Sequence, residues 1–197
     1  MISQELDVRG LRKPDKHPAI FQAYDALEVE GSVDLVNDHD PKHLREEFEI
    51  DHPGSHAWKY LDEGPAVWRI RITKLSSTPL PRVLCDTTAV VAGAEPDAAG
   101  ALWKLPMKTR DLDSNLIQLP PFGTVEAHSG PDLDVLVHVV HGTGRLTSEL
   151  GILELHAGSF VWLPRRSQRA FSAGADGFQY LTVHQRRQGG LSLAPFT

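Results

Sequence analysis

Residues 122–171 read FGTVEAHSGPDLDVLVHVVHGTGRLTSELGILELHAGSFVWLPRRSQRAF, and this stretch decides the fold of the second half of the chain. Short apolar runs are separated by Gly, Pro and Asp residues, and runs of about four to eight residues bounded in this way indicate β-strands. Together with its flanks from Leu102 onward, the stretch predicts an all-β barrel or sandwich. The candidate strands cover residues 115–119, 124–128, 135–140, 144–149, 152–155, 159–163, 170–173 and 178–184.

An α/β pattern precedes this stretch. LDVR at residues 6–9 reads as a strand, and Ile20, Tyr24 and Leu27 follow at the spacing of a helical stripe. SVDLVN at residues 32–37 alternates apolar and polar residues as a half-buried strand does. This part of the chain therefore alternates strand and helix with short connections.

A second helix and a hairpin complete this pattern. Asp40 is a candidate N-cap, and the apolar residues Leu44 and Phe48 follow it four residues apart. Aromatic-rich strands over residues 57–61 and 67–72 flank a Gly-Pro turn and predict a hairpin. The element order is βαβαββ, which predicts a two-layer α+β sandwich.

The sequence SSTPLP at residues 76–81 departs from both patterns and marks the domain boundary. A short strand is predicted after it over residues 82–89, and Cys85 within it is expected to be a structural thiol. We predict a first domain over residues 1–75, a linker with a short strand over 76–101, and a barrel over 102–197.

Length and composition suit two soluble domains. Of the 197 residues, 41% are hydrophobic and 23% are charged, and no apolar run approaches the roughly 20 residues of a membrane span. The single cysteine excludes an intrachain disulfide and a thiolate-rich metal site. The start MISQELDVRG lacks a signal-peptide pattern, so we expect a cytoplasmic protein that does not bind membranes.

The charge distribution argues against nucleic-acid binding. The net charge is −6, and residues 1–75 carry 10 basic against 15 acidic residues. A nucleic-acid-binding protein needs a basic face to replace counterions, and neither half of the chain offers one. A local cluster at Arg165, Arg166 and Arg169 is either a solvated rim, which is the commoner case, or a site whose guanidinium groups suit a carboxylate or phosphate.

Three phrases of the first domain resemble a bacterial family known as domain of unknown function 2249: LDVRGLRKPDKH, LVNDHDPKHL and YLDEGPAVWRIRI. That family is similar in turn to the TusA-like sulfur carriers, in which a cysteine follows the first strand at a helix N-terminus. Lys13 occupies the cysteine position here, and Lys16 replaces the second proline of the motif. Lysine cannot carry a persulfide, so the resemblance does not imply sulfur transfer.

Polar residues gather at one predicted edge of the first domain. If the first two strands lie parallel, their carboxyl ends bring together Arg9, Lys13, His17, Asp38, His39 and His43. One interpretation assigns the aspartates to turns and caps and the histidines to the surface. The other makes the edge a small site for an anion or a metal, since imidazole and carboxylate groups are common metal ligands.

The second domain resembles the cupins, whose RmlC-like barrels close as a jelly roll. The resemblance rests on AHSGPDLDVLVHVVHGTGRL, LHAGSFVWLP and FQYLTVHQ. Metal-binding cupins usually present a His-x-His pair, a nearby carboxylate and a further histidine in a second motif. His128 matches the first histidine, and the carboxylate position falls on Asp134 or, at a spacing longer by one residue, on Val135, but Gly130 and Arg169 replace the other two ligands.

These replacements leave two interpretations of the barrel. Divalent metal sites generally use three or more protein ligands, so the resemblance implies no resident cofactor. An unusual site for one Fe, Mn or Zn ion stays open if strand alternation turns both Asp134 and His138 inward beside His128.

A pocket for an organic anion is the second interpretation. Its candidate ligand-binding residues are His128, Asp134, Trp162, Arg169 and His184. The arginine would supply a fixed positive charge and the aromatic side chains an apolar wall. The opposing possibility is that Arg169 points outward or pairs with Asp132 or Asp134.

The predicted function is non-catalytic binding of a small anionic molecule or a protein partner, with a homodimer formed through the cupin domain. One alternative is a metal-dependent cupin enzyme, an oxygenase or isomerase that uses the rearranged histidines and aspartate. The other is a structural module that only dimerises.

Overall fold

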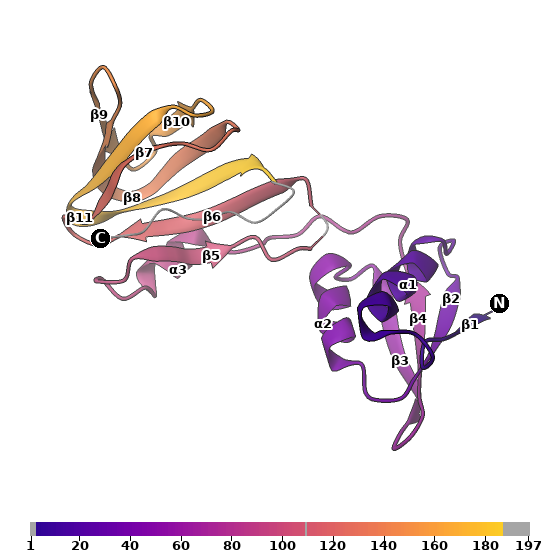
Figure 1. The fold of residues 1–197 in the computed structure, drawn as a ribbon. Coiled ribbons are helices and arrows are strands. Elements are labelled where there is room, and N and C mark those ends of the chain that lie inside the picture. The colour runs from indigo at the N-terminus through magenta and orange to yellow at the C-terminus, as the bar shows by residue number, and fades with distance from the viewer. Residues whose placement is uncertain (1–2, 109, 187–197) are drawn as a thin grey trace. The chain divides into compact units, whose positions relative to one another are not determined.

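The computed structural model describes residues 3–108 and 110–186, and it divides the chain into two compact units over residues 1–82 and 83–197 (Figure 1). Residues 187–197 of the predicted barrel lie outside the described residues. None of the described helices has the length and apolar character needed to cross a membrane.

The first domain is a four-stranded sheet with two helices. Its elements are β1 (Ser3–Asp7), α1 (Lys13–Asp25), β2 (Ser32–Asn37), α2 (Lys42–Asp51), β3 (His56–Glu63) and β4 (Trp68–Lys74). The strand order is β1-β2-β4-β3, in which β1 is parallel to β2 and the other pairs are antiparallel. The predicted βαβαββ order and the β3–β4 hairpin are confirmed.

One apolar core joins both helices to the sheet. Ile20 and Tyr24 of α1 and Leu44 and Phe48 of α2 are fully buried, as their helical spacing predicts. They pack against alternate residues of β2 and β4, namely Val33, Leu35, Ile70 and Ile72. Full burial of such a side chain stabilises the fold by roughly 1.5–3 kcal/mol, so this core holds the domain together.

The predicted cap of the second helix is wrong. Helix α2 begins at Lys42 with Pro41 in the N-cap position, and no side chain caps it. Asp40 instead accepts a hydrogen bond at Oδ1 from the Tyr60 hydroxyl at 2.9 Å. The aspartate therefore links β3 to the start of α2 through this hydrogen bond.

The second domain is built almost entirely from antiparallel strands. Its elements are α3 (Thr87–Ala92), β5 (Gly100–Lys104), β6 (Leu112–Leu119), β7 (Thr124–Ser129), β8 (Val135–Thr147), β9 (Ile152–His156), β10 (Phe160–Leu163) and β11 (Gln168–Gln185). The strands follow the order β10-β8-β11-β6-β5, and β7 pairs with β11 while β9 pairs with β8. The predicted fold class, an α+β sandwich followed by an all-β domain, is confirmed.

Two pairs of predicted strands are each a single bent strand. Residues 135–140 and 144–149 both fall largely in β8, and residues 170–173 and 178–184 both fall in β11. The β8–β11 register shifts between Ala173 and Phe178, at the glycine-containing segment that the sequence suggested was a turn. The glycines therefore allow a bend and a close approach of strands without ending them.

The predicted strand over residues 82–89 is also wrong. Residues 87–92 form α3, because the Asp86 carboxylate accepts hydrogen bonds from the backbone N–H groups of Thr88 and Ala89 at 2.9 and 3.3 Å. This is the N-cap geometry that starts a helix. Cys85 lies just before it as a half-buried free thiol.

The close approach of β8 to β11 predicts which glycine tolerates no side chain. Gly142 has φ +76°, and a Cβ there would lie 2.1 Å from the Gly177 carbonyl oxygen. Gly142→Ala should therefore destabilise the second domain by about 2 kcal/mol or more. Gly151→Ala is the matched control, because a Cβ there meets nothing within 4 Å.

Native-state hydrogen exchange of the β8 and β11 amides measures this loss in the full chain, since it reports local as well as global opening. Equal protection in the two variants would contradict the proposed close approach.

Candidate functional site

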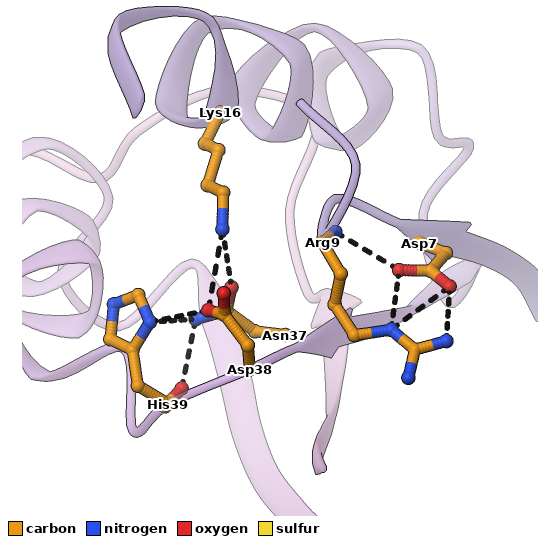
Figure 2. Close-up of polar contacts among 6 residues, drawn as sticks. All are labelled: Asp7, Arg9, Lys16, Asn37, Asp38 and His39. Atoms are coloured by element: carbon orange, nitrogen blue, oxygen red, sulfur yellow. Dashed lines mark hydrogen bonds and ion pairs between the residues drawn. The ribbon is translucent and has the colours of Figure 1, made fainter. Parts of the chain in front are cut away.

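The polar edge of the first domain begins with an ion pair at the end of β1. The Arg9 guanidinium donates to both carboxylate oxygens of Asp7, with Nη2 2.6 Å from Oδ2 (Figure 2). Hydrogen bonds from Arg9 lower the pKa of Asp7 from 3.8 to about 2. The stabilisation from this pair is therefore present above pH 3.8 and is lost as the pH falls towards 2.

A second group forms where β2 ends. Lys16 of α1 donates from Nζ to Asn37 Oδ1 and Asp38 Oδ1, both at 3.3 Å, and His39 Nδ1 donates to Asp38 Oδ1 at 2.6 Å. The bond from His39 is the main cause of the lowered pKa of Asp38. Figure 2 shows Lys16 pointing from the helix towards Asn37, Asp38 and His39, while Arg9 and Asp7 form a separate pair.

The predicted edge residues are thus divided among separate partners. His17 Nδ1 lies 3.1 Å from Glu47 Oε2 and His43 Nδ1 lies 3.3 Å from Glu46 Oε2. Lys13 is exposed at the first residue of α1. The structure brings Asp38 and His39 together with Lys16, whose only signal in the sequence is that it replaces a proline of the family motif.

The cupin-like domain contains a different arrangement, centred on Arg169. This residue lies on β11 directly opposite His128 on β7, so the two side chains share a face of the sheet. Arg169 is only 5% exposed and His128 is half-buried. The sheet therefore places an arginine and a histidine side by side at a largely buried position.

The Arg169 guanidinium binds neutral oxygens. Its Nη2 donates to the Pro164 carbonyl at 3.1 Å and to Ser167 Oγ at 3.0 Å, and its Nε donates to the Ser167 carbonyl at 3.3 Å. Burial lowers the pKa of Arg169. No carboxylate contacts the guanidinium in the part of the chain that the structure describes.

The two aspartates considered as partners of Arg169 are bound elsewhere. Asp132 pairs with Arg166 at 2.7 Å, and Asp134 accepts the backbone N–H of Arg165 at 2.9 Å. Arg169 therefore points inward, and both aspartates interact instead with the exposed arginines Arg165 and Arg166.

Gly130 explains how Arg169 fits. A Cβ at residue 130 would lie 1.8 Å from Arg169 Nη2, so the guanidinium fills the space that a side chain at this position needs. A histidine at residue 130 and the observed Arg169 conformation exclude one another. The two departures from the metal-binding cupin pattern are therefore physically linked.

The other predicted pocket residues do not gather around Arg169. Trp162 is 61% exposed, because the inward positions of β10 are Val161 and Leu163. Asp134 and His138 share a face as alternation predicts, but that face is exposed, whereas the alternative metal site requires it to face inward. His184 is buried near the far end of β11, where its Nδ1 donates to the Gln185 carbonyl at 2.9 Å.

The metal alternative requires three converging ligands. Within residues 3–108 and 110–186, no group of three or more His, Cys, Asp or Glu side chains could hold a metal ion. His128, Asp134 and His138 are all inside this range, and the structure does not bring them together as a ligand set.

Residues 5–74 match the model of a family described as "Uncharacterized conserved protein (DUF2249)". This match confirms the resemblance noted for the first domain. No curated protein matches the chain.

Solved cupin structures are similar to the second domain. A cupin superfamily protein of Desulfitobacterium hafniense has 15% identity and a TM-score of 0.46, covering 55% of this chain and 95% of its own. A cupin-2 domain protein of Shewanella frigidimarina has 14% identity and a TM-score of 0.42, covering 52% and 95%. Oxalate decarboxylase of Bacillus subtilis, described with Mn(II) centres, has 22% identity and a TM-score of 0.38, covering 44% of this chain but 24% of that chain.

Both resemblances named from the sequence agree with these matches. The fold itself is established by the antiparallel strand pairing described above, and the similarities to solved structures concern the fold alone.

The contact between residues 130 and 169 can be tested by a double-mutant cycle. Gly130→Ala should displace the guanidinium from its acceptors and destabilise the second domain by roughly 1–3 kcal/mol. In an Arg169→Ala background the same substitution should cost less than about 0.5 kcal/mol, because the clashing group is gone.

Hydrogen exchange at β7 and β11 provides the measurement. Additive losses in the double variant would show that the two residues do not compete for one space.

Proposed function

We propose that the second domain is a non-catalytic binding module for a small organic anion, whose negative group lies beside Arg169 and His128. The observation that carries this proposal is a buried guanidinium whose bonds all go to neutral oxygens. A buried charge is costly unless it is paired, and a bound carboxylate or phosphate would supply the pairing.

The arrangement around Arg169 leaves donors available for such a ligand. Within the described ranges, Arg169 Nη1 donates no hydrogen bond, whereas Nε and Nη2 are both used. His128 Nδ1 donates to the Glu126 carbonyl at 2.8 Å, which leaves Nε2 as its free ring nitrogen. A protonated His128 would give the anion a second charged donor next to the arginine.

This proposal predicts ligand-dependent stabilisation of the full chain. Acetate, oxalate, citrate and phosphate are suitable probes, and one that binds only the folded state should raise its stability by about 2.7 kcal/mol at a hundredfold excess over its dissociation constant. The increase in melting temperature should disappear in Arg169→Gln. Arg145→Gln is the matched control, because Arg145 is exposed and paired with Glu154 at 2.8 Å.

A panel with no Arg169-dependent shift would contradict the anion-binding function. Near-stoichiometric Fe, Mn or Zn in the purified protein that is lost on His128→Ala would instead support the metal-dependent oxygenase or isomerase.

We also propose that the second domain forms a homodimer through an exposed apolar face. This apolar face consists of adjacent residues on three paired strands: Phe160 and Trp162 of β10, Leu136 and His138 of β8, and Leu181 and Val183 of β11. Phe160 is 67% exposed and Trp162 61%. Since aromatic side chains bury roughly 150–250 Å² each, these two alone offer about 200–300 Å² to a partner.

A second copy of this chain suits the apolar face better than a charged partner does. Its six residues include no lysine, arginine, aspartate or glutamate, and Asp134, which follows on the same exposed face, is held by Arg165, so two copies can meet about a two-fold axis with little repulsion between like charges. A standard interface buries about 800 Å² per partner, and the aromatic pair would form its centre.

Trp162→Glu should convert the dimer into a monomer, because it places a charge at the centre of an apolar interface. Leu150→Glu, at a fully exposed residue outside the apolar face, should leave the dimer intact. Analytical ultracentrifugation of the full chain distinguishes these results. A wild-type protein that is monomeric at every concentration, or a dimer unaffected by Trp162→Glu, would contradict the assignment.

The likeness of the first domain to sulfur carriers does not extend, in our proposal, to their chemistry. Lys13 occupies the cysteine position and is exposed at the start of α1, and an amine cannot hold a persulfide. The single cysteine of the chain is consistent with a cytoplasmic location, where disulfides are rare.

A further inference from the structure

An open groove lies in the first domain between α2 and the edge strand β3. Its volume is about 650 Å³, within the range of small-molecule sites. The lining residues are Asp40, Lys42, Arg45, Glu46, Glu49, Ile50 and Tyr60. None of them belongs to the polar edge predicted from the sequence.

A buried donor without an acceptor lies next to this groove. Trp58 and Tyr60 alternate along β3 and therefore share the face that α2 covers, and their ring centroids are 6.4 Å apart. The Trp58 ring also packs 5.7 Å from Phe48 of α2. Trp58 Nε1 is buried without a hydrogen-bond partner, and no other buried side-chain nitrogen or oxygen of the described chain shares this property.

Tyr60 connects the unpaired donor to the groove. Its hydroxyl donates to Asp40 Oδ1, and burial is the main cause of its raised pKa. Trp58 and Arg45 act in the opposite direction and lower this pKa, although Trp58 Nε1 is too poorly placed to make a hydrogen bond to the hydroxyl. Tyr60 lines the groove and its ring packs against the Trp58 ring, so it joins the buried indole to the groove.

Arg45 differs from the other charged residues of the groove. Lys42 pairs with Asp40 at 3.9 Å, Glu46 lies 3.3 Å from His43 and Glu49 lies 3.7 Å from His56. Arg45 makes no ion pair with any described residue. The groove thus contains one cation that makes no ion pair with a described residue, and the buried N–H that lacks an acceptor lies behind its lining residue Tyr60.

We propose that this groove binds a small monocarboxylic acid. One carboxylate oxygen pairs with Arg45, and the other accepts the hydrogen bond of Trp58 Nε1 after a small side-chain shift of Tyr60. The apolar part of the ligand lies against Ile50. The acidic residues Asp40, Glu46 and Glu49 repel additional negative charge, so the groove selects a monoanion over phosphate or a dicarboxylate.

The Trp58 indole N–H signal in a proton–nitrogen correlation spectrum provides a specific test in the full chain. Benzoate is the probe, benzamide its neutral analogue, and Trp58→Phe assigns the signal. We expect a saturable downfield shift with benzoate and none with benzamide or phosphate. The shift should be lost in Arg45→Gln and kept in Arg12→Gln, whose arginine is exposed and outside the groove.

No saturable shift, an equal shift with benzamide, or a response unchanged by Arg45→Gln would overturn the proposed site. An equal response to phosphate would overturn the selection of a monoanion. Arg169→Gln should not alter the response, so this result is independent of the anion site in the second domain.

Discussion

Strand β11 is the element on which the second domain depends. It pairs along its length with β6, β7 and β8, and the remaining strands join the sheet through these three. Its first half pairs with β7 and its second half with β6, and the register with β8 shifts between Ala173 and Phe178, where the two halves meet. The bend requires backbones to approach closely, and at Gly142 no room remains for a side chain next to Gly177.

The bend also separates two kinds of polar residue on the same strand. Near the far end, His184 is buried with a backbone acceptor, and in the middle Gln179 is tied to Gln118 and His141 by hydrogen bonds of 3.1 and 3.0 Å. These groups are satisfied within the protein, as buried polar groups generally are. Arg169 at the start of β11 differs, because its charge is buried among neutral acceptors. Because of this difference, the start of β11 is the position in the domain where a buried charge has no charged partner among the described residues.

The first domain distributes its charges in the opposite manner. Arg9 pairs with Asp7, Lys16 with Asp38 and His17 with Glu47, so its polar edge has little charge left for a ligand. Exposed pairs of this kind contribute little to stability, and the apolar core between the helices and sheet holds the domain together. The buried Trp58 N–H without an acceptor, and the exposed Arg45 that makes no ion pair with a described residue, occur instead where α2 meets the edge strand.

The sequence alone determined most of the local elements and which residues share a face. The spacing of Ile20 and Tyr24 and of Leu44 and Phe48 predicted two amphipathic helices, and alternation predicted that Asp134 and His138 share a face. Because alternation does not say which face is covered, only the tertiary structure showed that this face is exposed and that Trp162 joins it.

The bends in β8 and β11, the cap of α3 and the neutral acceptors of Arg169 were likewise not predicted from the sequence. The acceptors of Arg169 come from the neighbouring turn before β11, and the sequence pattern does not show this contact. Trp58 gave no sequence signal, since an aromatic residue in a strand is ordinary. Its missing acceptor is a property of packing between segments distant in sequence, and only the folded chain defines it.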